Sequence, residues 1–112
     1  MRITKSNINE FIKGSLMGCP NKGITHIEYI PDGITGLNCH SNRLTKLPNL
    51  PNVLKNLECD ENELVSLPKL PESLEYLSCH NNNLPYEVTL DNYKEKHNKF
   101  IKRKLILSRI CG

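Results

Sequence analysis

The sequence has little of what builds a large core or crosses a membrane. Tryptophan is absent, and aromatic residues make up 5% of the 112 residues, so the core must be built from Leu, Ile and Cys. No apolar run approaches the roughly 20 residues of a membrane-spanning helix, and residues 1–14 lack the continuous apolar core of a signal peptide. With a net charge of +3, the chain is expected to form one small soluble domain.

Enzyme signatures are missing as well. The sequence contains no GxSxG, HExxH or phosphate-binding loop, and no Cys paired with a plausible activating His. We therefore expect no enzymatic activity, no catalytic residues and no cofactor.

What the sequence does contain is a 20-residue period. Four landmarks recur in register, and prolines recur at the same spacing in residues 47–51 and 67–71. The landmarks are Leu37, Leu57 and Leu77; Cys39, Cys59 and Cys79; Asn42, Asn62 and Asn82; and Leu44, Leu64 and Leu84. An earlier copy around Met17 and Cys19 is degenerate and has Lys22 in place of its Asn, and the pattern stops after Leu84. The unit reads LxxLxCxxNxLxxLPxLPxx.

This unit resembles the leucine-rich repeat family, in the short LPxLP type found in bacterial effectors and in proteins of large DNA viruses of amoebae. The alternation of Leu and Cys with polar residues predicts one short strand per unit, and the prolines disfavour helix on the return side. The expected fold class is a leucine-rich repeat solenoid. It would have about four 20-residue coils, a short parallel β-sheet on the concave face, a nearly helix-free convex side, and helical N- and C-terminal caps.

The two flanks are expected to be those caps. Asn7 with Glu10, and Asn92 with Glu95, have the spacing of a capping box. The predicted organisation is a single domain over 1–112, with an N-terminal cap at 1–13, four leucine-rich repeats at 14–91 and a C-terminal capping helix at 92–112. Residues 93–112 hold seven Lys and Arg and one acid, so this helix is expected to be basic. Effectors of this type often carry a ubiquitin-ligase domain, for which this chain is too short.

Five cysteines lie at positions 19, 39, 59, 79 and 111. On parallel strands one unit apart, their Cβ atoms would be separated by nearly the strand spacing, wider than a disulfide allows. We expect buried, reduced thiols, which favours a reducing intracellular compartment: the host cytoplasm, or a virion if the chain is viral. The repeated Asn is expected to bond backbone groups of its own and neighbouring units.

A row of three side chains follows the cysteines. His40, Asp60 and His80 share one position of the unit, and two imidazoles beside a carboxylate could hold a divalent metal. An exposed ladder of side chains is the favoured interpretation, because two histidines that are two strands apart are widely spaced for one ion. We therefore predict no metal site.

The predicted function is a non-catalytic protein–protein interaction module that binds an unidentified protein through the concave face, with the C-terminal helix as a further contact. The alternatives are a self-associating structural protein, as a homodimer or a particle component, and, less favoured, a His/Asp metal-binding protein. Specific nucleic-acid binding and membrane-surface binding are not expected. The candidate partner-binding residues are Asn38, His40, Glu58, Asp60, Glu61, Tyr76, Ser78, His80, Lys99, Lys102, Arg103, Ile106 and Ile110.

Overall fold

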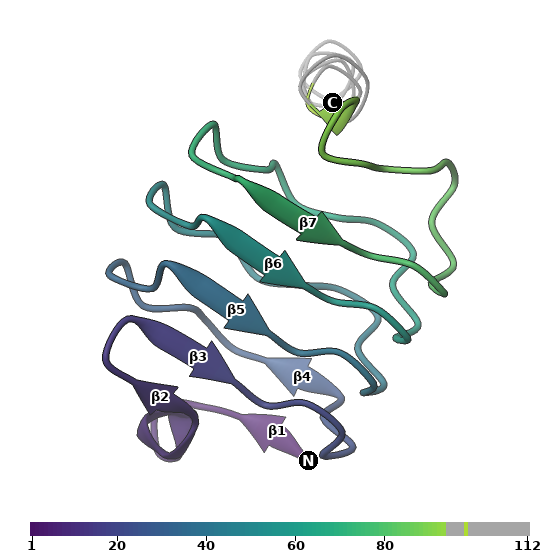
Figure 1. Ribbon diagram of the computed structural model, residues 1–112. Helices are drawn as coiled ribbons and strands as arrows, with labels where there is room; N and C mark the ends of the chain where they lie inside the picture. Colours follow the sequence, from purple (N-terminus) through teal and green to yellow (C-terminus); the bar gives the residue numbers. More distant parts are fainter. Residues whose placement is uncertain (94–97, 99–112) are drawn as a thin grey trace, which may run out of the picture.

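Two β-sheets organise the chain in the computed structural model, which describes residues 1–93 and Asn98 (Figure 1). The larger sheet has the strand order β2-β3-β5-β6-β7. Its strands are β2 (Ile12–Lys13), β3 (Leu16–Gly18), β5 (Gly36–Asn38), β6 (Asn56–Glu58) and β7 (Tyr76–Ser78). Behind it in Figure 1, β1 (Arg2–Ile3) pairs in parallel with β4 (His26–Ile27).

Strands β3, β5, β6 and β7 are parallel and offset by 20 residues. Leu37 is opposite Met17 on one side and Leu57 on the other, and Leu57 is opposite Leu77. The backbone ladder continues past the strand ends, where the Cys39 N–H donates to the Glu58 carbonyl at 2.8 Å. The apolar residue in the middle of each strand therefore points to the same side of the sheet, as the alternation in the sequence predicts.

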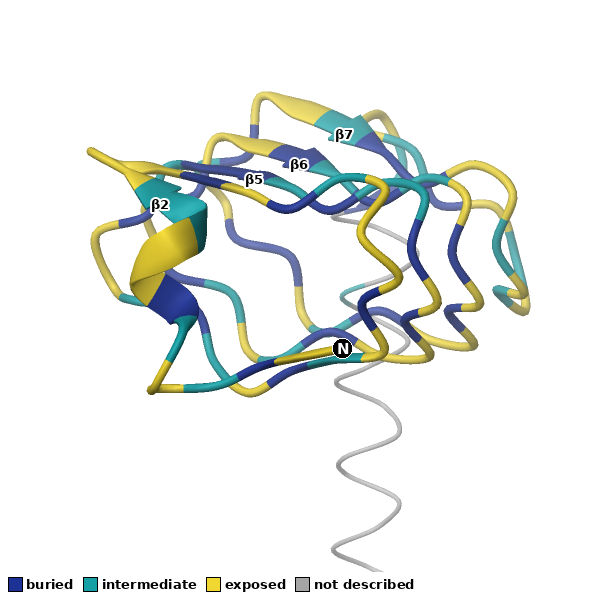
Figure 2. Ribbon diagram, turned by 90° about the horizontal axis from the view of Figure 1, so that it is seen from below, coloured by how far each residue is buried: buried dark blue, intermediate teal, exposed yellow. Residues whose placement is uncertain are grey.

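The core lies between the larger sheet and the return segments that connect its strands (Figure 2). The proline-containing segments 47–51 and 67–71 contain no helix, and they bury Leu47, Leu67 and Leu70 against the strand residues. Proline cannot donate the backbone hydrogen bonds that a helix requires. The return side of these units is accordingly extended.

A left-handed residue recurs at each turn that follows a strand of the parallel set. Asn21, Ser41, Glu61 and Asn81 have φ angles of 53° to 58°. Asn adopts this conformation more readily than most residues, whereas Ser and Glu pay a steric penalty there. The sequence period contained this position, but the residue types at 41 and 61 gave no signal for it.

The predicted fold class, a leucine-rich repeat solenoid with helical caps at both ends, is wrong. The sheets are mixed, because β2 runs antiparallel to β3, and β1 and β4 form a separate pair. Among the described residues there is almost no helix: η1 (Ile8–Phe11) is a single 3-10 turn. Ile12 leaves that turn for β2, and Gly14, with φ of 64°, allows the chain to fold back onto β3.

The predicted capping box at Asn7 is also wrong. The Asn7 side chain makes no cap bond to the helix and points backwards, accepting from the Thr4 N–H at 2.8 Å and donating to the Arg2 carbonyl at 2.9 Å. Asn92 makes the same two bonds, to the Thr89 N–H and the Glu87 carbonyl. At both ends the Asn closes a turn that begins at a Thr three residues earlier.

The predicted C-terminal capping helix lies outside the described residues, except for Asn92, Tyr93 and Asn98. Asn98 is fixed to the last return segment, because its side chain exchanges two hydrogen bonds with the Leu70 backbone at 3.0 and 2.9 Å. Within residues 1–93 and Asn98, no helix is long and apolar enough to cross a membrane. The predicted domain boundaries stay a prediction.

Candidate binding face

The side of the larger sheet that points away from the core is the candidate site, and we call it the outer face. It consists of two columns of residues in register across four parallel strands. The first column is Leu16, Gly36, Asn56 and Tyr76, and the second is Gly18, Asn38, Glu58 and Ser78. Every second residue of a strand points to the same side, so these positions follow directly from the inward direction of Met17, Leu37 and Leu57.

A hollow of about 490 Å³ lies over the first column, and Gly36 contributes to its lining. A Cβ atom at Gly36 would lie 2.7 Å from Cδ2 of Leu16, so the Leu16 side chain leans over this glycine. Leu16 and Tyr76 also line the hollow and are 57% and 49% exposed. Two large exposed side chains thus occupy the two ends of one column, and the Leu16 side chain covers part of Gly36 between them.

The charge around Glu58 is mainly negative, and Lys13 of β2, which lies opposite Leu16, is the one cation among the strand residues of this sheet. Glu58 lines the hollow and is half-buried, and its carboxylate makes no hydrogen bond or ion pair with the part of the chain that the structure describes. Asp60 and Glu61 follow it. Residues 16–20, 36–40, 56–60 and 76–80 contain no Lys or Arg, so no Lys or Arg of these segments offsets the carboxylates.

His40 and Asp60, in the row of His40, Asp60 and His80, form hydrogen bonds with neighbouring residues of the chain. Asp60 accepts from the Ser78 hydroxyl at 2.6 Å and from the His80 N–H at 2.7 Å. Nδ1 of His40 lies 3.0 Å from the hydroxyl of Ser41. Among the described residues, no group of three His, Cys, Asp or Glu side chains is placed to hold a metal ion. The Asp60 carboxylate instead ties two neighbouring strands together.

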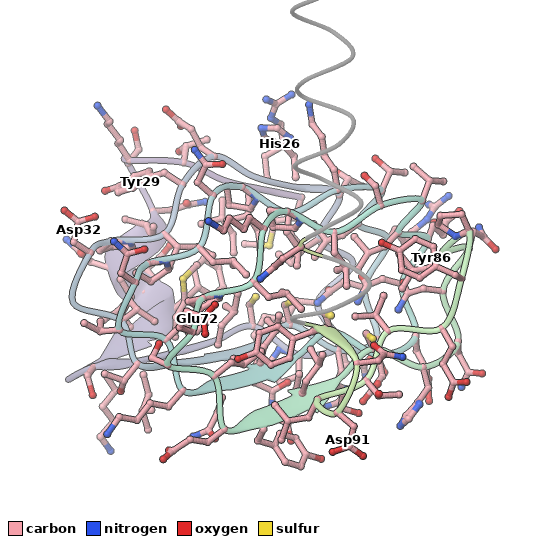
Figure 3. All side chains as sticks on the ribbon, turned by 90° about the horizontal axis from the view of Figure 1, so that it is seen from above. His26, Tyr29, Asp32, Glu72, Tyr86 and Asp91 are labelled. Carbon is pink, nitrogen blue, oxygen red and sulfur yellow. The ribbon has the colours of Figure 1, made fainter. Side chains whose placement is uncertain are left out.

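Four of the cysteines lie inside the core, and Figure 3 shows sulfur atoms in the interior of the molecule. Cys19, Cys39, Cys59 and Cys79 are free and buried, and the Cys79 thiol donates to the Val88 carbonyl at 3.1 Å. Burial raises the pKa of Cys19 and of Cys79 to about 11 and raises the pKa values of Cys39 and Cys59 further. Thiols protonated at neutral pH are poor nucleophiles and poor metal ligands. Cys111 lies outside the described residues.

The Asn residues of the repeat connect consecutive units. The Asn62 carbonyl oxygen accepts from the Leu44 N–H at 3.1 Å, and its NH₂ donates to the carbonyls of Cys39, Cys59 and Asp60 at 3.0 to 3.2 Å. Asn82 makes the equivalent bonds one unit later. The predicted structural role of the Asn column is confirmed.

The same bonds explain the degenerate first unit. The Asn42 carbonyl oxygen accepts from the N–H groups of Lys22 and Ile24 at 3.0 and 2.9 Å. The Asn of one unit thereby satisfies the turn of the unit before it, so the first turn needs no Asn of its own. Lys22 can occupy the Asn position because Asn42, and not the residue at position 22, makes these hydrogen bonds.

The structure brings together part of the predicted partner-binding set. Asn38, Glu58, Tyr76 and Ser78 lie on the outer face, although Ser78 is buried and bonded to Asp60. The others in the described part, His40, Asp60, Glu61 and His80, lie at or just beyond the carboxyl ends of the strands. Five predicted residues lie outside the described residues: Lys99, Lys102, Arg103, Ile106 and Ile110.

Sequence reasoning missed the hollow itself. It did not single out Leu16, Gly36 or Asn56, which complete the first column with Tyr76. The signal was present, because stepping back from Tyr76 by the 20-residue period reaches each of them in turn. A glycine in a column of larger residues would have indicated a depression there.

Comparison of the chain with protein-family models, with curated proteins and with solved structures finds no match. The resemblance to leucine-rich repeats therefore stays a prediction from the repeated residues.

Proposed function

We propose that this chain is a non-catalytic interaction module that binds a partner protein through the outer face of its larger sheet. The observation that supports the proposal most is the hollow at Gly36, with exposed Leu16 and Tyr76 at the ends of its column. Large apolar side chains around a depression are typical of contact surfaces, because they gain most from being covered. Asn56 and Glu58, between them, have side chains without hydrogen-bond partners in the described region.

The candidate chemical groups support a non-catalytic role. The thiols are buried with raised pKa values. The Asp60 carboxylate is bonded to Ser78 and to the His80 backbone, and Asn42 and Asn62 are buried and fully engaged with backbone groups. Within the described residues these groups stabilise the fold, which leaves the outer face as the surface offered to a partner.

Site-specific photo-cross-linking tests the proposal. Asn56 is replaced by p-benzoylphenylalanine, because it is exposed in the middle of the face and its side chain has no bonds to lose. Val65, which is 57% exposed in a turn away from the face, carries the probe in the control. We expect a discrete adduct from position 56 that unlabelled wild-type protein competes away. Identical adducts from both positions, or none from position 56, would contradict the proposal.

A second candidate, self-association, is favoured by the edge of the sheet. β7 is the last strand, and no strand pairs with its other edge among the described residues. An open edge offers unpaired backbone groups to another chain. The free edge of β7 would pair with that of a second copy to make a symmetric dimer.

Sedimentation analysis distinguishes this candidate from the first. Under self-association, the wild-type protein sediments as a dimer and Tyr76→Lys, which places a charge at the edge strand, sediments as a monomer. A concentration-independent monomer for both proteins rules out the second candidate and leaves the first intact.

A further inference from the structure

We infer that the outer face takes a cationic peptide segment of a partner protein, with one apolar side chain seated in the hollow at Gly36 and a Lys or Arg beside Glu58. This inference rests on the proposed function and specifies the chemistry of the partner. It depends on three features of the described residues: the shape of the hollow, the state of the Glu58 carboxylate, and the sign of the charge around it.

The hollow is large enough to take an anchoring side chain of a partner together with part of its neighbours. Gly36 is the one residue of its column without a side chain, and Leu16 and Tyr76 lie at the ends of that column, on β3 and β7. These strands are three strand spacings, or about 14 Å, apart. Depressions of this kind accept an anchoring side chain whose burial supplies much of the contact energy. The shape therefore selects an apolar or aromatic residue of the partner.

Glu58 determines the charge of the neighbouring residue. Its carboxylate lines the same hollow and is half-buried, but no cation or hydrogen-bond donor of the described chain engages it. A ligand seated in the hollow would cover this carboxylate further, and a covered charge without a partner is costly. A Lys or Arg of the ligand removes that cost. A neutral or acidic ligand does not.

The charges of the residues around Glu58 also favour a cationic ligand. Asp60 and Glu61 extend the negative charge beyond Glu58, and the four parallel-strand segments contain no Lys or Arg, whereas Lys13 of β2 lies opposite Leu16 at the far side of the face. Nucleic acid and anionic membranes carry the same sign of charge and are repelled from this face. A cationic peptide is attracted to it, and complementary charge accelerates its binding.

Selection from a displayed library of random heptapeptides, with the full chain as immobilised target, tests the inference. We expect the enriched sequences to share one Leu, Phe, Tyr or Trp with Lys or Arg within two residues of it. The enriched peptide of highest recovery is then synthesised and titrated in solution at low and high salt. Its affinity should fall as the salt concentration rises.

Three variants of the outer face test where the peptide binds. Gly36→Val places a side chain in the floor of the hollow, and the flexible, exposed Leu16 side chain is what must move to make room for it. Tyr76→Ala removes one end wall without touching the core, and Glu58→Gln removes the charge. Each should weaken binding by at least about tenfold, the usual scale for an anchoring contact. Matched controls away from the face, Val65→Ala and Glu28→Gln, should leave the affinity unchanged.

The outcomes separate the inference from the proposed function. If the enriched peptides are acidic or neutral but lose affinity in Gly36→Val and Tyr76→Ala, the face binds and the inferred charge is wrong. If no peptide is enriched, or if the peptides bind these two variants as well as the wild type, both the inference and the proposed function fail. If the enriched sequences match residues 94–112 of this chain, which hold seven Lys and Arg, the partner is a second copy, and the inference of a foreign segment is overturned.

Discussion

The inner and outer sides of the same strands differ in how far they repeat. On the inner side, Leu37, Leu57 and Leu77 recur without change, and the Cys and Asn columns recur beside them. On the outer side, the first column reads Leu, Gly, Asn and Tyr, so no residue type recurs. The backbone is the same for both sides, so the difference comes from what the side chains contact.

Each inner side chain makes the same contacts in every unit, which explains why the same residue types recur there. An Asn that bonds the turn before it and the carbonyls of two units cannot be replaced without leaving buried backbone groups unpaired. No such requirement acts on the outer column, because Gly36 has no side chain and those of Asn56 and Tyr76 make no bond that holds the sheet together. The outer column is free to vary, and its variation produces the hollow and its charge.

Asn62 on the inner side and Asn56 on the outer side of the same unit should differ most in what they contribute to stability. Asn62→Ala leaves the Leu44 N–H without its acceptor and removes the hydrogen bonds from the Asn62 amide to three carbonyl groups. This substitution should lower the free energy of unfolding by about 2–4 kcal/mol. Asn56→Ala, on the exposed side, should change it by less than about 0.5 kcal/mol. Urea unfolding of both variants measures the difference. Equal effects would show that the two sides do not differ as we describe.

Substitutions at Cys59 measure how strictly the inner side excludes polar groups. Cys59→Ser buries a hydroxyl in a fully covered site and should destabilise the protein by about 1–3 kcal/mol. Cys59→Val keeps the site apolar and should cost less. Thermal unfolding of the pair provides the measurement, and a Ser variant more stable than the Val variant would show that the column is not apolar.

The same thiols predict a dependence of stability on alkaline pH. Burial raises the pKa of Cys19 and Cys79 from about 9 to about 11, so above pH 9 the unfolded chain loses these protons before the folded chain does. The stabilisation from these two thiols is complete below pH 9 and is lost as the pH rises towards 11, by up to about 1.4 kcal/mol per pH unit for each thiol.

Unfolding free energies at a series of pH values from 8 to 11 measure this slope. Cys79→Val should have a shallower decline than the wild type between pH 9 and 11, because one of the titrating groups is gone. Parallel curves for the two proteins would exclude this thiol as a source of the pH dependence.

The smallest effect is expected at the left-handed turn residue. Glu61 has φ of 53°, and Asn21 and Asn81 have φ of 53° and 56° in their own turns. Glu61→Asn should stabilise the protein by about 0.5 kcal/mol, because Asn tolerates this conformation better. Glu63→Asn is the control, since Glu63 is not among the residues of positive φ. A stabilisation that is the same at both positions would assign the gain to charge rather than to the backbone.

Much of the larger sheet could be predicted from the period, because identical spacing forces equal register between parallel strands. The ends could not. The Asn-x-x-Glu spacing at Asn7 indicated a helix cap, but the side chain bonds to Thr4 and Arg2 instead. Asn side chains bond readily to nearby backbone groups in several local arrangements, and spacing alone does not choose between them. The antiparallel pairing of β2 depends on Gly14, whose positive φ has no signature in the repeat.

The residues of the candidate site also divide into those that the sequence predicted and those that it did not. Glu58 and Tyr76 were predicted because they are polar or aromatic on an outward position. Leu16 and Gly36 were not, since an apolar residue and a glycine attract attention only when their neighbours across the strands are known. The hollow is a property of several strands together, whereas the burial of Leu57 follows from one strand alone.

A comparison of the wild type with the double variant Leu16→Ala, Tyr76→Ala tests whether the inner side of the sheet holds the fold while the outer side binds the partner. The free energy of unfolding of the variant and its capture of the cross-linked partner are measured on the same preparation. We expect an unfolding free energy within about 1 kcal/mol of the wild type and a loss of binding of at least about tenfold. Unchanged binding, or a loss that merely follows the unfolded fraction, would contradict this expectation.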